Sequence, residues 1–149
     1  MKNICVIGTG YVGLVSGAGM ADFGNSVICA DIDKNKIDLL QEGGIPIYEP
    51  GLKELVERNV NAGRLTFSAD VETSVRNAEV IFIAVGTPMG DNGEADLKAV
   101  EDVATTIAKN LNSYKIICTK STVPVGTGAR LEALIAQEKE SDYEFDVVS

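Results

Sequence analysis

Histidine is absent from this sequence of 149 residues, and cysteine occurs only three times, as Cys5, Cys29 and Cys118. No Cys-x-x-Cys pair is present. Because zinc sites are built mainly from these two residue types at characteristic spacings, the sequence argues against a zinc site. Each cysteine lies in an apolar, β-branched run, where a thiolate is disfavoured. We therefore expect three buried thiols in a reducing compartment.

Positive charge is also scarce, with 13 lysines and arginines against 22 acidic residues and a net charge of −9. Such a chain repels nucleic acid and anionic lipid, so neither is an expected partner. No run approaches the roughly 20 apolar residues that span a bilayer, and residues 1–3 lead directly into a strand without a secretory signal. We therefore expect a cytoplasmic protein. Any anionic ligand must be held locally, by helix N-termini, backbone amides or single lysines.

Strand and helix signals alternate along the chain. Short apolar runs predict strands at residues 2–7, 26–30, 65–68, 80–85, 115–119 and 145–148. Helices are predicted at residues 11–23, 34–42, 50–61 and 127–139, and after the capping residues Asp70 and Asp96. In the second helix, Ile37, Leu40 and Leu39 are expected to face inward. The pattern predicts one α/β domain at residues 1–149, a Rossmann-type doubly wound parallel sheet in the order 3-2-1-4-5-6.

Two other features of the sequence have local explanations. Pro50 suits the first turn of a helix, because an amide there would lack a partner anyway. Asp91, Glu94 and Asp96 lack the spacing of an EF-hand calcium loop, and a turn followed by a helix cap accounts for them. We therefore expect no metal site.

The segment Gly8-Thr9-Gly10-Tyr11-Val12-Gly13 has the pattern G-x-G-x-x-G between a predicted strand and a predicted helix. In this context Gly8 permits a tight turn, and Gly10 allows the backbone to approach a pyrophosphate. Gly13, followed on the same face by Gly17, allows the helix to pack closely on the sheet. The N-terminus of that helix offers amide groups to an anion, so the segment predicts a dinucleotide site.

Asp31 ends the second predicted strand, near the spacing expected for the acid that binds ribose. A carboxylate there accepts hydrogen bonds from both ribose hydroxyls and repels a 2′-phosphate, which favours NAD over NADP. Helix capping is the competing explanation for an acid at this place, and it applies better to Asp33.

Three further segments accompany the glycine motif: Tyr48-Glu49-Pro50-Gly51-Leu52, Val85-Gly86-Thr87-Pro88 and Lys120-Ser121-Thr122-Val123-Pro124-Val125-Gly126. In this order the chain resembles, over its whole length, the UDP-glucose/GDP-mannose dehydrogenase family. Its residues 86–97 are similar to those of bacterial UDP-glucose 6-dehydrogenases. The resemblance implies oxidation of UDP-glucose to UDP-glucuronate with two NAD, through a thiohemiacetal and a thioester on a cysteine. GDP-mannose or another UDP-sugar is the alternative substrate.

The resemblance also implies roles for single residues. Val12, Asp31 and Lys36 match NAD contacts of the first βαβ unit, beside the motif residue Tyr11. Thr87 matches a cofactor contact after the fourth strand, and Thr122 matches one after the fifth strand, near the nicotinamide and the reacting carbon. Thr122 is thereby expected to have a supporting role in catalysis. Without the resemblance, Thr87 and Thr122 would be loop residues that bond their own backbone, and Lys36 would be a solvated helix residue.

The family's catalytic cysteine and its general acid/base carboxylate match no position in this sequence. The resemblance therefore implies that residues 1–149 are the N-terminal part of a longer enzyme, which bind NAD but do not catalyse on their own. The substrate domain and a long helix that forms a homodimer or larger oligomer would lie elsewhere.

Two other classes share part of this pattern. A stand-alone NAD-sensing regulatory module would share the glycine motif and Asp31, but it has no reason to carry Gly-Thr-Pro and Lys-Ser-Thr-Val-Pro-Val-Gly at successive strand ends. The 3-hydroxyacid and 3-hydroxyacyl dehydrogenases lack the Tyr-Glu-Pro-Gly-Leu segment.

Overall fold

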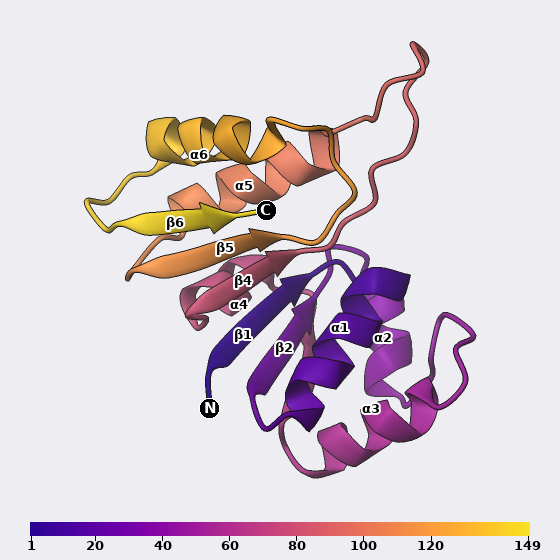
Figure 1. Cartoon of the computed structure of the whole chain (residues 1–149). Coiled ribbons are helices and arrows are strands. Elements are labelled where there is room, and N and C mark those ends of the chain that lie inside the picture. Colours follow the sequence, from indigo (N-terminus) through magenta and orange to yellow (C-terminus); the bar gives the residue numbers. More distant parts are fainter.

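The computed structural model describes residues 1–149, and its centre is one parallel sheet of six strands. The strands are β1 (Asn3–Ile7), β2 (Ser26–Ala30), β3 (Leu65–Ser68), β4 (Val80–Ile83), β5 (Lys115–Thr119) and β6 (Phe145–Val148). They lie in the order β3-β2-β1-β4-β5-β6, which confirms the predicted topology. Figure 1 shows the part of this order from β2 through β1, β4 and β5 to β6. The chain reverses direction across the sheet between β1 and β4, and open α/β sheets bind ligands at such a switch point.

Helices cover both faces of this sheet (Figure 1). They are α1 (Tyr11–Asp22), α2 (Lys34–Gln41), α3 (Leu52–Asn61), α4 (Val71–Arg76), α5 (Lys98–Lys109) and α6 (Thr127–Glu138). Leu14, Ile37 and Val56 represent α1, α2 and α3 in one apolar cluster on one face. Val75 and Leu131 represent α4 and α6 in the cluster on the other face, to which α5 also contributes. The central strands β1, β2 and β4 are therefore buried between two layers, as their continuous apolar sequences require, whereas the edge strand β6 has no fully buried residue. None of the helices combines the length and the apolar character needed to cross a bilayer.

Four local expectations need correction. The third helix begins at Leu52 with Gly51 as N-cap in the left-handed conformation (φ 81°), so Pro50 precedes the helix. Leu39 is 40% exposed, because only Ile37 and Leu40 of α2 face the sheet. The fourth strand ends at Ile83, two residues early.

The carbonyl of Ile83 explains the early end of β4, because it accepts from the amides of both Lys120 and Ser121. The fourth correction concerns the start of α5. Asp96 accepts from the amide of Lys98 at 2.9 Å, but the N-cap position is Leu97, so the carboxylate reaches the helix from one residue further out.

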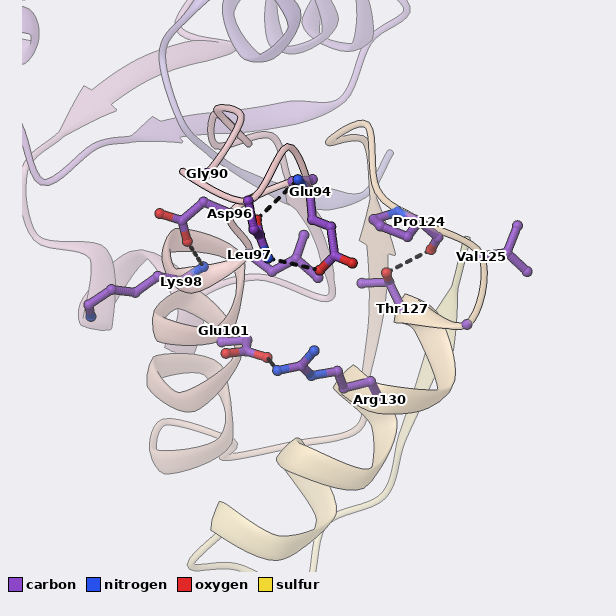
Figure 2. Close-up of a pocket in the computed structure, with 13 residues that line it drawn as sticks. Gly90, Glu94, Asp96, Leu97, Lys98, Glu101, Pro124, Val125, Thr127 and Arg130 are labelled. Carbon is purple, nitrogen blue, oxygen red and sulfur yellow. Dashed lines mark hydrogen bonds and ion pairs between the residues drawn. The ribbon is translucent and has the colours of Figure 1, made fainter.

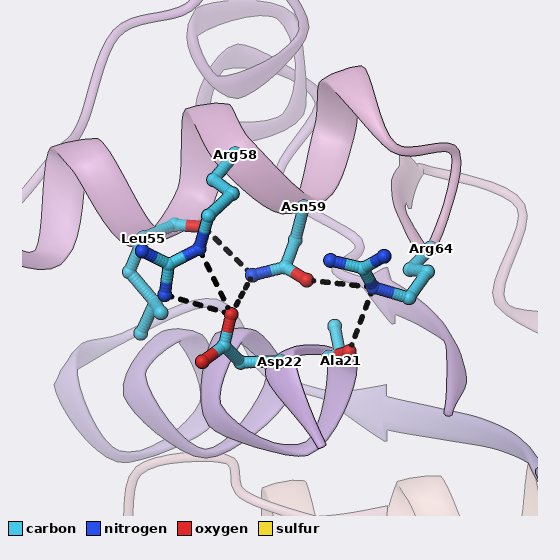
Figure 3. A network of polar contacts seen from close by, with 6 residues as sticks. All are labelled: Ala21, Asp22, Leu55, Arg58, Asn59 and Arg64. Atoms are coloured by element: carbon cyan, nitrogen blue, oxygen red, sulfur yellow. Dashed lines mark hydrogen bonds and ion pairs between the residues drawn. The ribbon is translucent and has the colours of Figure 1, made fainter. Parts of the chain in front are cut away.

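A polar network anchors the C-terminal end of α1 to α3 and to the start of β3 (Figure 3). Arg64 donates from Nε to the carbonyl of Ala21 at 3.1 Å and to Oδ1 of Asn59 at 3.0 Å. Oδ1 of Asp22 accepts from Arg58 and from Nδ2 of the fully buried Asn59. These contacts fix the end of α1 that lies away from the glycine motif.

Candidate cofactor-binding site

The glycine motif forms a turn of very close approaches between β1 and α1. Gly8 has a φ of 107°, and a Cβ there would lie 2.5 Å from the carbonyl oxygen of Ala84. A Cβ on Gly13 would lie 1.8 Å from the carbonyl oxygen of Gly8. One on Gly17 would meet Sγ of Cys29 at 2.5 Å. Gly8 is therefore required by the turn and its close approach to Ala84, and Gly13 and Gly17 are required by the close packing of α1, as the sequence predicts.

Gly10 differs from these three glycines, because a Cβ there would meet no atom within 4 Å. It is the N-cap of α1, no side chain caps this end, and the first turn contains no acidic residue. The first turn of a helix leaves amide groups without internal partners, and together with the helix dipole they favour an anion. Open space above Gly10 and an uncapped helix end fit the pyrophosphate of a dinucleotide.

Asp31 follows β2 and is fixed by three hydrogen bonds. Its Oδ2 accepts from the amide of Thr9 at 2.8 Å and from the Thr9 hydroxyl at 2.7 Å, while Oδ1 accepts from the amide of Asp33 at 2.9 Å. Partial burial raises the pKa of Asp31, but the bonds from Asp33 and Thr9 and the charge of Lys36 outweigh it and hold the pKa below its ordinary value. The carboxylate is therefore ionised at neutral pH.

Asp33, by contrast, is the N-cap of α2. Its side chain accepts from the amides of Asn35 and Lys36, which confirms the assignment of helix capping to Asp33. Lys36 is exposed, and its charge lowers the pKa of Asp31. The loop after β2 thus contains two acids with different roles: Asp33 caps α2, and Asp31 is the candidate ligand-binding acid.

Tyr11 and Val12 occupy the exposed side of the first turn of α1, with exposures of 54% and 43%. The Tyr11 hydroxyl donates to Oε2 of Glu49 at 3.0 Å, and this contact raises the pKa of Tyr11. Glu49 belongs to the Tyr-Glu-Pro-Gly-Leu segment between α2 and α3. The contact therefore joins the glycine motif to the Tyr-Glu-Pro-Gly-Leu segment.

Thr87 and Thr122 lie together beyond the ends of β4 and β5. The Thr87 hydroxyl donates to the carbonyl oxygen of Thr122 at 2.8 Å, and the neighbouring Ser121 hydroxyl donates to the carbonyl of Val85 at 2.6 Å. At the last residue of β5, the buried hydroxyl of Thr119 has no partner. The two loops that follow β4 and β5 are thus held side by side at the carboxyl edge of the sheet.

A cavity of about 790 Å³ lies beyond these threonines, between the N-terminal ends of α5 and α6 (Figure 2). Its lining includes Lys98 and Arg130, but both cations are already paired. Lys98 contacts Asp102 at 2.8 Å, and Arg130 contacts Glu101. None of the residues of the glycine motif lines this cavity, so the cavity and the glycine turn are separate features of the structure.

The structure contains no cluster of side chains suited to a metal ion. Burial raises the pKa values of Cys5 and Cys29 to about 12, so both are protonated thiols. Cys118 is only half-buried, which differs from the expectation; the adjacent Ile117 points to the opposite face of β5 and is fully buried in the cluster that includes α5 and α6. Burial still raises the pKa of Cys118. None of the three thiols has the character of a nucleophile.

Thr9 is the site residue that motif reading missed. Its side chain is fully buried between two glycines, although the motif assigns no role to that position. The available signal was a hydroxyl residue two positions after the end of β1, close to the acid that directly follows the neighbouring strand.

Comparison with known proteins agrees with this geometry. Residues 2–149 match the model of the UDP-glucose/GDP-mannose dehydrogenase family, NAD binding domain. The UDP-glucose 6-dehydrogenase TuaD of Bacillus subtilis is 56% identical over 149 residues, all of this chain and 32% of TuaD. The UDP-glucose 6-dehydrogenase of Rhizobium meliloti is 54% identical over 137 residues, 91% of this chain and 31% of that protein. The chain thus spans about a third of the length of these relatives.

Solved structures give the same result. A UDP-glucose dehydrogenase from the archaeon Pyrobaculum islandicum superposes with a TM-score of 0.94 at 36% identity, covering 99% of this chain and 35% of the other. A GDP-mannose dehydrogenase from Pseudomonas aeruginosa gives a TM-score of 0.92 at 34% identity, covering 97% and 35%. This chain belongs to the UDP-glucose/GDP-mannose dehydrogenase family and corresponds to its NAD binding domain.

Proposed function

We propose that this chain binds NAD at the carboxyl edge of the sheet and serves as the cofactor-binding part of a UDP-glucose 6-dehydrogenase. The observation that carries the proposal is the pairing of an uncapped helix end at Gly10 with a fixed, ionised Asp31 on the adjacent strand. NAD, when bound, supplies the acceptor for a hydride from the sugar alcohol. UDP-glucose is preferred over GDP-mannose because the relatives of higher identity carry that name.

Each residue of the site has a separate part in this proposal. Gly8, Gly10 and Gly13 shape the turn, and the amides that begin α1 at Tyr11 and Val12 hold the pyrophosphate. Asp31 accepts from the adenosine ribose, and its charge opposes a 2′-phosphate. Lys36 lies next to this carboxylate as a cation for the phosphate side.

Thr87 and Thr122 supply hydroxyls on the nicotinamide side. Thr122 supports the reacting end there, without itself exchanging a proton. The three thiols are protonated and two of them are fully buried, and the catalytic cysteine and general acid/base carboxylate that the resemblance implies match no position in this sequence. We therefore expect these 149 residues to bind NAD without oxidising UDP-glucose. The proposal includes a cytoplasmic location, a UDP-sugar as the partner, no nucleic acid or membrane partner, and a homodimer or larger oligomer formed through a helix outside these residues.

Calorimetric titration of NAD and NADP into the chain tests this function. The unaltered chain is expected to prefer NAD, and Asp31→Ala is expected to lower NAD affinity and to reduce that preference. Asp38→Ala removes the same charge from α2, at a side chain paired with Lys34, and is the matched control. A chain that binds NADP more tightly, or an Asp31→Ala variant with unchanged preference, contradicts the proposed role of Asp31.

A second measurement addresses the missing chemistry. With UDP-glucose and NAD, the purified chain is expected to give no NADH above the rate without protein. Steady NADH production that scales with the amount of chain, and that survives replacement of all three cysteines, would show that the catalytic groups lie within these residues.

A further inference from the structure

Thr9 makes two hydrogen bonds to a single atom of the cofactor acid. Its amide lies 2.8 Å and its hydroxyl 2.7 Å from Oδ2 of Asp31. The side chain of Thr9 is fully buried, whereas the carboxylate is only partly buried. Hydrogen bonds to an ionised group are about twice as strong as neutral ones, so the buried Thr9 restrains the position of the Asp31 carboxylate.

The acceptor capacity of the carboxylate shows what this contact leaves for a ligand. An ionised carboxylate offers about four lone-pair sites, two on each oxygen. The two donors of Thr9 fill Oδ2, and the amide of Asp33 takes one site on Oδ1. One site on Oδ1 remains, so Asp31 has room for one ribose hydroxyl rather than for the two expected from the sequence.

We propose that Thr9 is a positioning residue for cofactor selection, which holds Oδ2 of Asp31 so that Oδ1 and the negative charge stay directed at the ribose. This inference rests on the proposed NAD function. Thr9 does not touch the ligand in this arrangement, and it acts only through Asp31.

The consequence for selectivity follows from restricted rotation. A carboxylate that is free to turn about its side-chain torsions can swing away from a 2′-phosphate and take a cation between them. A carboxylate with one oxygen doubly bonded to a buried residue cannot do so without losing both bonds. Its repulsion of the phosphate is therefore retained, and NADP is disfavoured more strongly than by charge alone.

The pH dependence of NAD binding offers a second measure of how Thr9 acts on Asp31, so the charged groups around Asp31 matter. Lys36 on α2 is the cation whose charge lowers the pKa of Asp31, and Asp33 contributes its backbone amide. The turn from Gly8 to Leu14 contains no charged side chain, and the end of β3 contributes the carbonyl of Ser68, which accepts from the Asp31 amide at 3.2 Å. The carboxylates of Asp33, which caps α2, and of Glu49, which accepts from Tyr11, are other acids near the site, so a shift of the acid limb of NAD binding is assigned to Asp31 by its disappearance in the Asp31→Ala background.

The test compares Thr9→Val, which keeps the shape and removes the hydroxyl, with Thr9→Ser, which keeps the hydroxyl. Thr9→Val is expected to weaken NAD about tenfold and to reduce the preference for NAD over NADP by a similar factor, because a bond to a charged group is lost. Protonation of Asp31 becomes easier, so NAD binding is lost at a higher pH as the solution is acidified. Thr9→Ser is expected to restore the affinity ratio and the pH profile.

A double variant separates positioning from a general loss of structure. In the Asp31→Ala background, Thr9→Val is expected to leave the NAD/NADP ratio unchanged, because the group through which it acts is gone. If Thr9→Val alone fails to fold, Thr9→Ala, which leaves room for a water beside Oδ2, gives the same comparison.

Two results would overturn the inference: a folded Thr9→Val or Thr9→Ala variant with the ratio and pH profile of the unaltered chain, or an equal shift in both backgrounds. If the unaltered chain does not bind NAD, the proposed function itself fails. If it binds NAD and Asp31→Ala alters the preference while Thr9→Val does not, only the inference about Thr9 fails.

Discussion

The two ends of the parallel strands differ in how their polar groups are paired. We call the side where the strands begin the amino edge and the side where they end the carboxyl edge. At the amino edge, the fully buried Lys115 donates from Nζ to the carbonyls of Ala78 at 2.6 Å and Arg76 at 3.3 Å. Beside it, the amide of Asn3 donates to Oε2 of Glu79 at 3.0 Å. At this edge, the polar groups described are paired within the chain, and the charged side chains of Lys115 and Glu79 hydrogen-bond backbone groups of the fold.

At the carboxyl edge, polar groups are left without partners in the chain. The helix end at Gly10 has no side-chain cap, and the buried hydroxyl of Thr119 has no acceptor or donor. Unsatisfied groups of this kind cost stability unless water or a ligand pairs with them. Both of these unpaired groups lie at the carboxyl ends of the strands, where the NAD site is proposed, so substitutions at the two ends of the strands should have separate effects.

The largest expected effect is at the carboxyl edge, with Gly10→Val. The branched side chain would occupy the open space where the pyrophosphate is proposed to lie, so NAD affinity should fall on the order of 100-fold through lost bonds to a charged group. The fold should persist, because a Cβ at Gly10 meets no atom. Gly19→Val is the matched control near the other end of α1, where a Cβ also meets nothing.

Calorimetry with NAD and a thermal melt check this pair of glycine variants. The control should keep its NAD affinity. A Gly10→Val variant that melts cooperatively and binds NAD normally would remove the glycine turn from the site.

Lys115→Met tests the amino edge and has the next largest expected effect. The substitution leaves the carbonyls of Ala78 and Arg76 without a buried donor, which should lower the free energy of unfolding by about 1–3 kcal/mol. NAD affinity should not change, because Lys115 lies at the opposite edge from Gly10. Denaturant titration and calorimetry measure the two quantities, and exposed Lys109→Met serves as the control. A loss of NAD affinity in folded Lys115→Met would show that the edges are coupled.

Thr87→Val sharpens the comparison within the carboxyl edge. It removes the bond to the carbonyl of Thr122 and should cost about 0.5–1.5 kcal/mol of stability. Thr122→Val keeps that bond, because Thr122 contributes its backbone oxygen. Both variants should weaken NAD without altering the NAD/NADP ratio, which belongs to Asp31. A changed ratio in either one would place the 2′ position of the ribose near β4 and β5.

The smallest expected effect concerns Glu79 and pH. The amide of Asn3, and then the charge of Lys2, lower the pKa of Glu79. A lowered folded-state pKa contributes stability above the ordinary value of about 4.3, and that stability is lost as the pH falls through the folded value. Glu79→Gln should therefore flatten the acid dependence of the melting temperature without affecting NAD binding. Glu132→Gln, at an exposed acid without a hydrogen-bond partner, should leave the slope unchanged.

Much of this architecture could be predicted because the apolar runs are short and sharply bounded. The strands at residues 26–30, 65–68, 115–119 and 145–148 begin and end where the sequence indicates, since polar residues or turns flank each run. Boundaries failed where tertiary contacts decide them. Ile83 ends β4 because two amides from the following loop take its carbonyl, and the left-handed Gly51 displaces the helix start from Pro50.

The site was predictable at the positions that a motif names, and less so where one side chain acts on another. The glycine spacing identified Gly8, Gly10 and Gly13, and the strand end identified Asp31. Local sequence does not show that the hydroxyl of Thr9 bonds Asp31. The two residues are 22 positions apart, and only the pairing of β1 with β2 brings them together. The roles of the three glycines and of Asp31 toward NAD remain predictions, as do those of Tyr11, Val12, Lys36, Thr87 and Thr122.

The network at the far end of α1 has a consequence for cofactor engineering. Arg64 holds the last turn of this helix through the carbonyl of Ala21, so the helix is secured from its C-terminal end. The loops of the proposed NAD site can then be varied while the far end of α1 stays anchored. A library that varies residues 31 and 36 while keeping the buried Thr9 and residues 22, 58, 59 and 64 should yield folded proteins with altered nucleotide preference.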